Sequence, residues 1–302
     1  MKALGIMSAR WLAVTMLVFF GPGLNIANAT APCGDFGECK VLVEVNSTDG
    51  DIGFHFLMDG DDLIHAALLN PAHKTIFSYS VRRELRRQYL TETFAESAEP
   101  LCFDPLEDDD EENDDEDFVT LEDFLDRWQE GDYHFFGIGK DWELSHGVST
   151  LSFKLPAAPT ELEFEFEVDG EDVEGEISWQ AGDDLGECSD GMELLPMAPE
   201  NVPVRAWEVV FEPDVEDDHP AVGMKYVVRI PGDAEELEVE VPDDYLEALA
   251  ALDENIPAKI EVGAIGFDDN ATFSETDEIC VNENDPDEED DVDGCGFEID
   301  DE

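Results

Sequence analysis

The stretch Glu161–Val168 reads Glu-Leu-Glu-Phe-Glu-Phe-Glu-Val and decides the fold class of this chain. Successive side chains of a β-strand point to opposite faces, so this strict alternation predicts one buried apolar face and one face of carboxylates. The same pattern returns at Glu236–Val241, which reads Glu-Leu-Glu-Val-Glu-Val. We therefore predict two strands that bury leucine, phenylalanine and valine and present glutamate to solvent.

Five more strands are predicted around these two, with turns rich in Gly, Pro and Asp between them. They are Val173–Trp179, Val204–Glu212, Met224–Ile230, Ala258–Ile265 and Thr272–Glu278. Seven short strands over residues 160–280 favour an antiparallel β-sandwich. An insertion, Gln180–Val202, interrupts their regular spacing.

Three segments of this half resemble fibronectin type III domains. Ile177-Ser178-Trp179 is similar to the strand-B tryptophan of that family, Ile256–Gly266 resembles its strand F, and Asp269–Glu275 resembles the turn into strand G. The resemblance implies a fibronectin type III-like sandwich. It implies no activity, because such sandwiches host many functions.

The chain as a whole resembles a group of exported bacterial proteins of unassigned activity. The resemblance lies in Gly50–His55, Leu90–Pro100 and Glu130–Tyr133. It implies export and supplies no mechanism.

The N-terminal half, residues 30–154, is predicted to be a β-rich domain with short helices. Alternation predicts strands at Val41–Val45, Ile52–Met58, Lys74–Val81, Tyr133–Ile138 and Val148–Phe153. Asp49-Gly50 and Asp59-Gly60 have the composition of turns after the first two strands. Helical spacing predicts helices within Arg82–Ser97 and Leu121–Trp128. The fold class is therefore mainly β in both halves.

Two segments are predicted to lie outside the two domains, and a third, residues 104–117, is predicted to be a loop within the N-terminal domain. Residues 104–117 form an acidic loop in which eleven of fourteen residues are Asp or Glu, and residues 281–302 form an acidic tail. Residues 155–159, which contain two prolines, are predicted to be an interdomain linker.

The first 29 residues are predicted to be a signal peptide. Lys2 and Arg10 form a positively charged region before an apolar run, Trp11–Phe20, and Ala27-Asn28-Ala29 has the small-x-small pattern of a cleavage site. The run is too short to span a bilayer, which takes about 20 apolar residues. We expect an exported protein, periplasmic or extracellular, that begins at Thr30 and has no membrane span.

The chain carries 79 acidic and 15 basic residues, for a net charge of −64. Nucleic acids and anionic lipid surfaces would repel such a protein, so we exclude both as direct partners. Excess carboxylate keeps a surface hydrated at high salt, where screening is strong. Salt adaptation and specific cation binding are the two interpretations of this charge.

All six cysteines lie beyond the predicted signal peptide, and an even number in an exported chain favours disulfides. Six cysteines allow 15 pairings, and the sequence does not choose among them. As hypotheses we take the local pairs Cys33–Cys39 and Cys280–Cys295, which leave Cys102–Cys188 to join the two halves.

The acidic tail contains one candidate Ca²⁺ site. Glu289, Asp291 and Asp293 stand at positions 1, 3 and 5 of an EF-hand-like loop, Gly294 at position 6 and Asp300 at position 12. Position 1 of such loops is usually Asp, and no helix can follow the loop here, so a plain charge run is the competing interpretation.

No sequence motif for catalysis is present. The chain contains no HExxH, GxSxG, P-loop or dinucleotide-binding glycine pattern, and its six histidines are scattered. We expect each histidine to be a packing or surface residue. Arg82, Arg83, Arg86 and Arg87 form the one cationic cluster of the sequence. We expect them to pair with the protein's own carboxylates, and a site for a small anion or polyanion is the alternative.

These observations favour an exported, non-enzymatic binding or interaction protein with a strongly acidic, salt-tolerant surface. The first alternative is a Ca²⁺ or other cation-binding protein that uses the acidic loop and tail. The second is a carboxylate-based glycan hydrolase, which needs two carboxyl groups at a set separation. No cofactor is indicated apart from Ca²⁺, and the partner's identity is not encoded in any motif.

Overall fold

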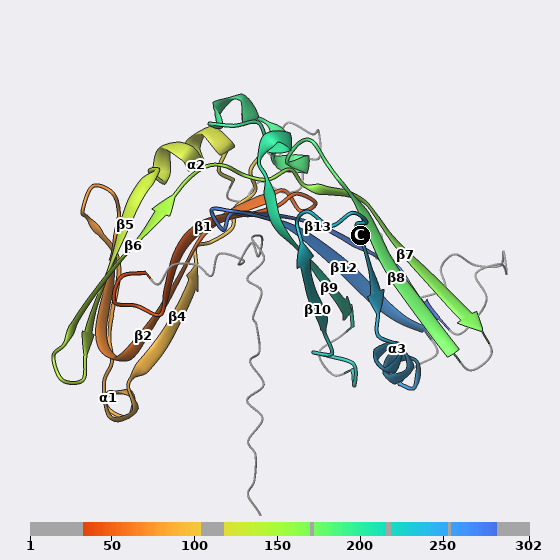
Figure 1. The fold of residues 1–302 in the computed structure, drawn as a ribbon, viewed down its shortest axis with the longest axis horizontal. Helices are drawn as coiled ribbons and strands as arrows, with labels where there is room; N and C mark the ends of the chain where they lie inside the picture. The colour runs from red at the N-terminus through yellow and green to blue at the C-terminus, as the bar shows by residue number, and fades with distance from the viewer. Residues whose placement is uncertain (1–32, 104–117, 170–171, 216–218, 253–254, 283–302) are drawn as a thin grey trace, which may run out of the picture. The chain divides into compact units, whose positions relative to one another are not determined.

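The computed structural model describes residues 33–103, 118–169, 172–215, 219–252 and 255–282 (Figure 1). As the sequence predicted, the fold is mainly β with a few short helices, and its strands form two sheets. The larger sheet has ten strands, eight of them in the order β10-β9-β12-β13-β1-β2-β5-β6. The smaller sheet has the order β11-β8-β7.

The N-terminal half contributes six strands and two short helices. They are β1 (Glu38–Asn46), β2 (Asp51–Leu69), β3 (Thr75–Ser80), α1 (Leu85–Gln88), β4 (Leu90–Glu96), α2 (Leu121–Arg127), β5 (Gly131–Gly139) and β6 (Leu144–Leu151). Side chains that alternate along these strands, such as Val41, Val43 and Val45, are buried together with Phe124 and Tyr133 in one hydrophobic core. At about 25 cal/mol per Å² of buried apolar surface, this core is the main stabilising contribution of the half.

Two predictions for this half are wrong. Asp59-Gly60 is not a turn, because β2 continues through it as one strand whose register shifts between Asp59 and Leu63. The helix predicted within Arg82–Ser97 shrinks to the four residues of α1, and the rest becomes β4. Thr93 and Phe94 suit a strand, and pairing of β4 along β2 satisfies backbone groups that a lone helical turn would leave unpaired.

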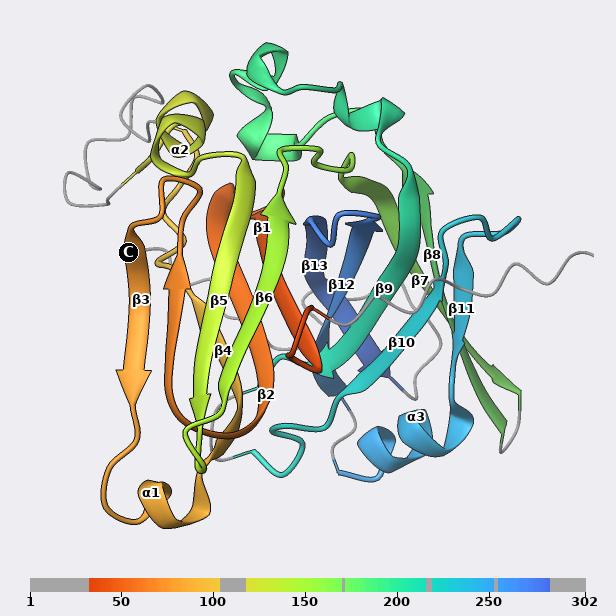
Figure 2. The same cartoon turned by 60° about the vertical axis from the view of Figure 1, so that its left-hand side comes forward.

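The C-terminal half contains all seven predicted strands. They are β7 (Pro159–Asp169), β8 (Asp172–Ala181), β9 (Val204–Pro213), β10 (Tyr226–Pro231), β11 (Glu238–Val241), β12 (Asn255–Gly266) and β13 (Ala271–Asn282) (Figure 2). Ile177, Trp179 and Val239 from the smaller sheet share a buried core with Val209 and Val262 from the larger one. The helix α3 (Asp243–Ala250), which the sequence pattern did not predict, adds Leu246 and Leu249 to this core.

The two halves share a continuous sheet through β1 and β13, which pair in parallel. Asn270, fully buried, reinforces this junction: its Oδ1 accepts a hydrogen bond from Val43 N at 2.9 Å, and its Nδ2 donates to Ser152 O at 2.8 Å. Thr272 Oγ1 donates to Pro156 O at 2.7 Å. The segment predicted as a linker is therefore hydrogen-bonded to β13 over part of its length.

Two of the three predicted disulfides, Cys33–Cys39 and Cys102–Cys188, are present. The third, Cys280–Cys295, falls outside the residues whose side chains the structure describes. Cys102–Cys188 closes a sequence separation of 86 residues and attaches the insertion after β8 to the N-terminal core. In the described ranges, no helix has the length and apolar character needed to cross a bilayer.

Candidate functional site

The outward face of β2, β5 and β6 carries no carboxylate over three consecutive rows of paired residues. The rows follow from the strand register, which places directly paired side chains on the same face. We call these nine residues the histidine face: Leu69, His134, Val148; Ala67, Phe136, His146; His65, Ile138, Leu144. Every one of them is apolar or histidine.

Several of these apolar side chains are exposed to solvent. Leu144 is 77% exposed, Phe136 41% and Val148 39%. Contiguous exposed apolar patches larger than a few hundred Å² are rare on monomeric soluble proteins and often mark interaction sites. The chain carries 79 acidic residues, and none of them stands at the nine positions of this face.

The exposed side of the smaller sheet shows the contrast. There Glu176 of β8 pairs with Glu165 of β7 on one side and with Glu240 of β11 on the other. Repulsion from Glu176 raises the pKa of the neighbouring Glu238. Like charges directly opposite each other destabilise a sheet, so this face suits a medium in which salt screens them.

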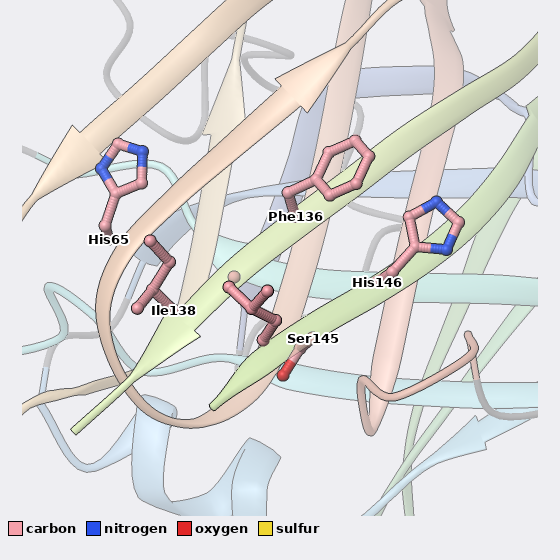
Figure 3. Close-up of a pocket in the computed structure, with 7 residues that line it drawn as sticks. His65, Phe136, Ile138, Ser145 and His146 are labelled. Atoms are coloured by element: carbon pink, nitrogen blue, oxygen red, sulfur yellow. The ribbon is translucent and has the colours of Figure 1, made fainter. Parts of the chain in front are cut away.

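An open pocket of about 400 Å³ lies on the histidine face. Figure 3 shows its labelled residues on neighbouring strands, with His65 on β2, Phe136 and Ile138 on β5, and His146 on β6. The rings of Phe136 and His146 lie 4.8 Å apart between centroids. The lining of the pocket is almost entirely apolar, so the pocket can accept an apolar group.

Four of the six histidines gather on or beside this face. His134 Nδ1 lies 3.2 Å from His146 Nε2, and the His73 ring lies 5.0 Å from that of His134. His65 Nδ1 lies 2.8 Å from Ser80 Oγ of β3. The prediction that the histidines are scattered missed this group, because the register of three strands, and not spacing along the chain, brings them together.

A second cluster, formed by Glu44, His55 and Glu99, lies on β1, on β2 and just after β4. His55 is buried at 3% exposure, and its Nε2 lies 2.7 Å from Glu99 Oε1 while its Nδ1 lies 3.9 Å from Glu44 Oε2. Gly53 makes room for this contact, since a Cβ there would lie 2.6 Å from Glu99 Oε1 and 2.9 Å from His55 Nε2.

Burial raises the pKa of Glu44 to about 7. The imidazole of His55 opposes this rise, and the carboxylates of Glu99, Glu261 and Glu96 add to it. Burial likewise raises the pKa of Asp51, to about 6. The cluster can therefore exchange a proton near neutral pH, and its one imidazole and two carboxylates are a donor set that suits a divalent metal ion.

The candidate Ca²⁺ ligands Glu289, Asp291, Asp293 and Asp300 lie outside the described residues, as does the acidic loop 104–117. Arg82, Arg83, Arg86 and Arg87 lie before and within α1, and all are exposed. Among described residues none of these arginines forms an ion pair with a carboxylate, so the expected pairing is not found there.

Comparisons with known proteins assign no family. No family model matches the chain, and no curated protein matches its sequence. A solved structure from work on host cell surface retention of a 1.5-MDa bacterial ice-binding adhesin is similar over 82% of this chain, with 10% identity and a TM-score of 0.23. The match spans 63% of that protein's chain, less than two thirds of its length. A likeness this weak carries no argument about fold or function.

Proposed function

We propose that this is an exported, non-enzymatic binding protein that docks its partner on the histidine face. The observation that carries the proposal is the nine-position face of apolar residues and histidines, free of carboxylates, on a chain with a net charge of −64. Exposed apolar surface with a polar rim is typical of protein interaction sites. The absence of carboxylate at these positions removes the repulsion that the remaining acidic surface would exert on an approaching apolar surface.

Export is part of the proposal. The predicted signal peptide supports it, and so do two disulfides, which form and persist in oxidising compartments. For the C-terminal half we propose a fibronectin type III-like sandwich, and its support is a core between one set of three and one set of four antiparallel strands.

The chemistry of the face defines the partner. It fits a protein surface that offers apolar side chains and no dense positive charge, because the face itself supplies no carboxylate to pair with. Rows of glutamate on β7, β8 and β11 would keep other parts of the molecule hydrated in a salt-rich medium. In this proposal the acidic surface keeps the protein soluble and the histidine face contacts the partner.

The test is capture of exported proteins of the source cells on the immobilised mature chain. The face variant combines Phe136→Thr with Leu144→Thr, which remove apolar area and keep good strand formers. The matched control combines Val227→Thr with Phe267→Thr, which are 49% and 62% exposed elsewhere on the chain. We expect the wild type and the control to retain the same partner and the face variant to lose it. Equal retention by the face variant, or no capture by the wild type, would contradict the proposal.

Cation binding is the second candidate, and the cluster of Glu44, His55 and Glu99 favours it. Calorimetry with Ca²⁺ and Mg²⁺ in 0.15 M NaCl tests it on the whole mature chain. A heat of binding that is still measurable in this salt and is smaller in Glu99→Gln would support a specific site. Heat that vanishes in the salt reduces the effect to condensation of cations on the acidic surface.

A further inference from the structure

We propose that His134 and His146, joined by His73, form a binding site for a borderline divalent transition-metal ion such as Zn²⁺. The site lies at one end of the histidine face and goes beyond the docking function, because it takes a small ion and needs no protein partner. Its ligands come from β5, from β6 and from the turn between β2 and β3.

The separation of the two nitrogens is the first observation. His134 Nδ1 and His146 Nε2 face each other at 3.2 Å. Zinc binds imidazole nitrogen at about 2.0–2.1 Å in tetrahedral geometry, which places two such ligands roughly 3.3 Å apart. This contact is a hydrogen bond between the two rings, so the proton between the nitrogens must leave before both can bind an ion. The separation of the nitrogens already matches that of two ligands of one ion.

A third imidazole lies within reach. The ring of His73 has its centroid 5.0 Å from that of His134. Its nitrogens do not converge with those of the pair in this structure, so the exposed side chain must turn to complete the site. The backbone turn at His73 is fixed by backbone hydrogen bonds, since His73 N donates to Asn70 O at 2.8 Å. Three histidines leave a fourth tetrahedral position for water or for a group from a docked partner.

The backbone around His146 is held on both sides. His146 N donates to Asp35 Oδ2 at 3.0 Å, and Asp35 N donates to His146 O at 3.0 Å. The Cys33–Cys39 disulfide fixes the segment that contains Asp35, and the Phe136 ring packs against His146. A ligand held by its scaffold loses little freedom when the metal binds.

The donor set gives selectivity that the acidic surface lacks. Ca²⁺ and Mg²⁺ take oxygen ligands, whereas a site of neutral imidazoles suits Zn²⁺, Ni²⁺ or Cu²⁺. The abundant carboxylates of this chain attract every cation by long-range charge, an effect that salt screens. A nitrogen site would thus hold a transition metal even where Mg²⁺ is in large excess.

The experiment is a Zn²⁺ titration of the mature chain by calorimetry in 0.5 M NaCl with excess Mg²⁺, repeated with Co²⁺ to read the visible spectrum of a tetrahedral site. We expect one ion bound through the histidine pair, and at least a tenfold loss of affinity for that ion in His134→Gln and in His146→Gln. The matched controls are His65→Gln, on the same face, and His219→Gln, in the C-terminal half. Both should bind Zn²⁺ with the affinity of the wild type. Circular dichroism checks that each variant is folded.

Affinity unchanged in His134→Gln and His146→Gln would overturn the inference, as would binding that disappears in Glu99→Gln instead. The absence of Zn²⁺ binding in the wild type would also overturn it. None of these results bears on partner capture by the apolar residues, so the two proposals fail separately.

Discussion

Replacing Glu44 by Gln should make the protein more stable above neutral pH and leave its stability nearly unchanged in mild acid. Burial holds the pKa of this carboxyl at about 7 in the folded protein, against an ordinary value of 4.5. The folded state therefore binds the proton more tightly than the unfolded state does. The stability that this proton binding provides is complete below about pH 4.5 and is lost as pH rises toward 7.

The magnitude follows from the two pKa values. A difference between 4.5 and about 7 corresponds to at most about 3.4 kcal/mol, at 1.36 kcal/mol for each pH unit. The Glu44 side chain is 36% exposed, so solvent screens part of this penalty. We compare the free energy of unfolding of Glu44→Gln with that of the wild type. This difference should grow by about 1–2 kcal/mol between pH 4.5 and pH 8.

Urea unfolding at several pH values in 0.15 M NaCl, with the disulfides intact, measures this gain. Glu163→Gln on the exposed face of β7 removes the same formal charge and is the matched control; its curve should run parallel to that of the wild type. Parallel curves for the wild type and Glu44→Gln would refute the reasoning, because they would mean that Glu44 does not titrate differently in the folded state.

Three further predictions concern other parts of the molecule. Gly53→Ala should displace the Glu99 carboxylate from His55 and lower the free energy of unfolding by up to about 2 kcal/mol. The displacement should shift the side-chain NMR signal of His55, and an unmoved signal would contradict the steric argument. Replacing Cys102 and Cys188 together by serine should lower the free energy of unfolding by about 2–4 kcal/mol, since the bridge closes an 86-residue separation, and an unchanged urea midpoint would speak against this. Melting temperature should rise between 0.05 and 1 M NaCl because salt screens the glutamate row around Glu176; a fall would count against it.

The C-terminal strands could be predicted because their sequence alternates strictly. In β11 the buried Val239 and Val241 alternate with exposed glutamates, so the pattern predicts both the strand and the face that it buries. The helix α3 follows directly, yet its eight residues bury only Leu246 and Leu249 and begin at a proline cap without a side-chain hydrogen bond. A helix this short and this weakly marked gives little signal in a sequence.

Contacts between distant segments could not be predicted. Asn270 lies 227 residues from Val43. No local sequence pattern predicts that its side chain accepts a hydrogen bond from the backbone N–H of a strand in the other half. The histidine face depends in the same way on the registers of β2, β5 and β6. The sequence held one indication of this face. His134, Phe136 and Ile138 occupy alternate positions with no carboxylate among them, which is unusual in so acidic a chain.

Site-specific photo-crosslinking in the source cells is the strictest test of partner docking on the histidine face. A photoreactive amino acid replaces Leu144 on the histidine face, or Val227 on β10 as the control, both with exposed side chains. We expect a discrete adduct with one partner from position 144 and none from position 227. Adducts of equal yield from both positions, or none from position 144, would contradict it.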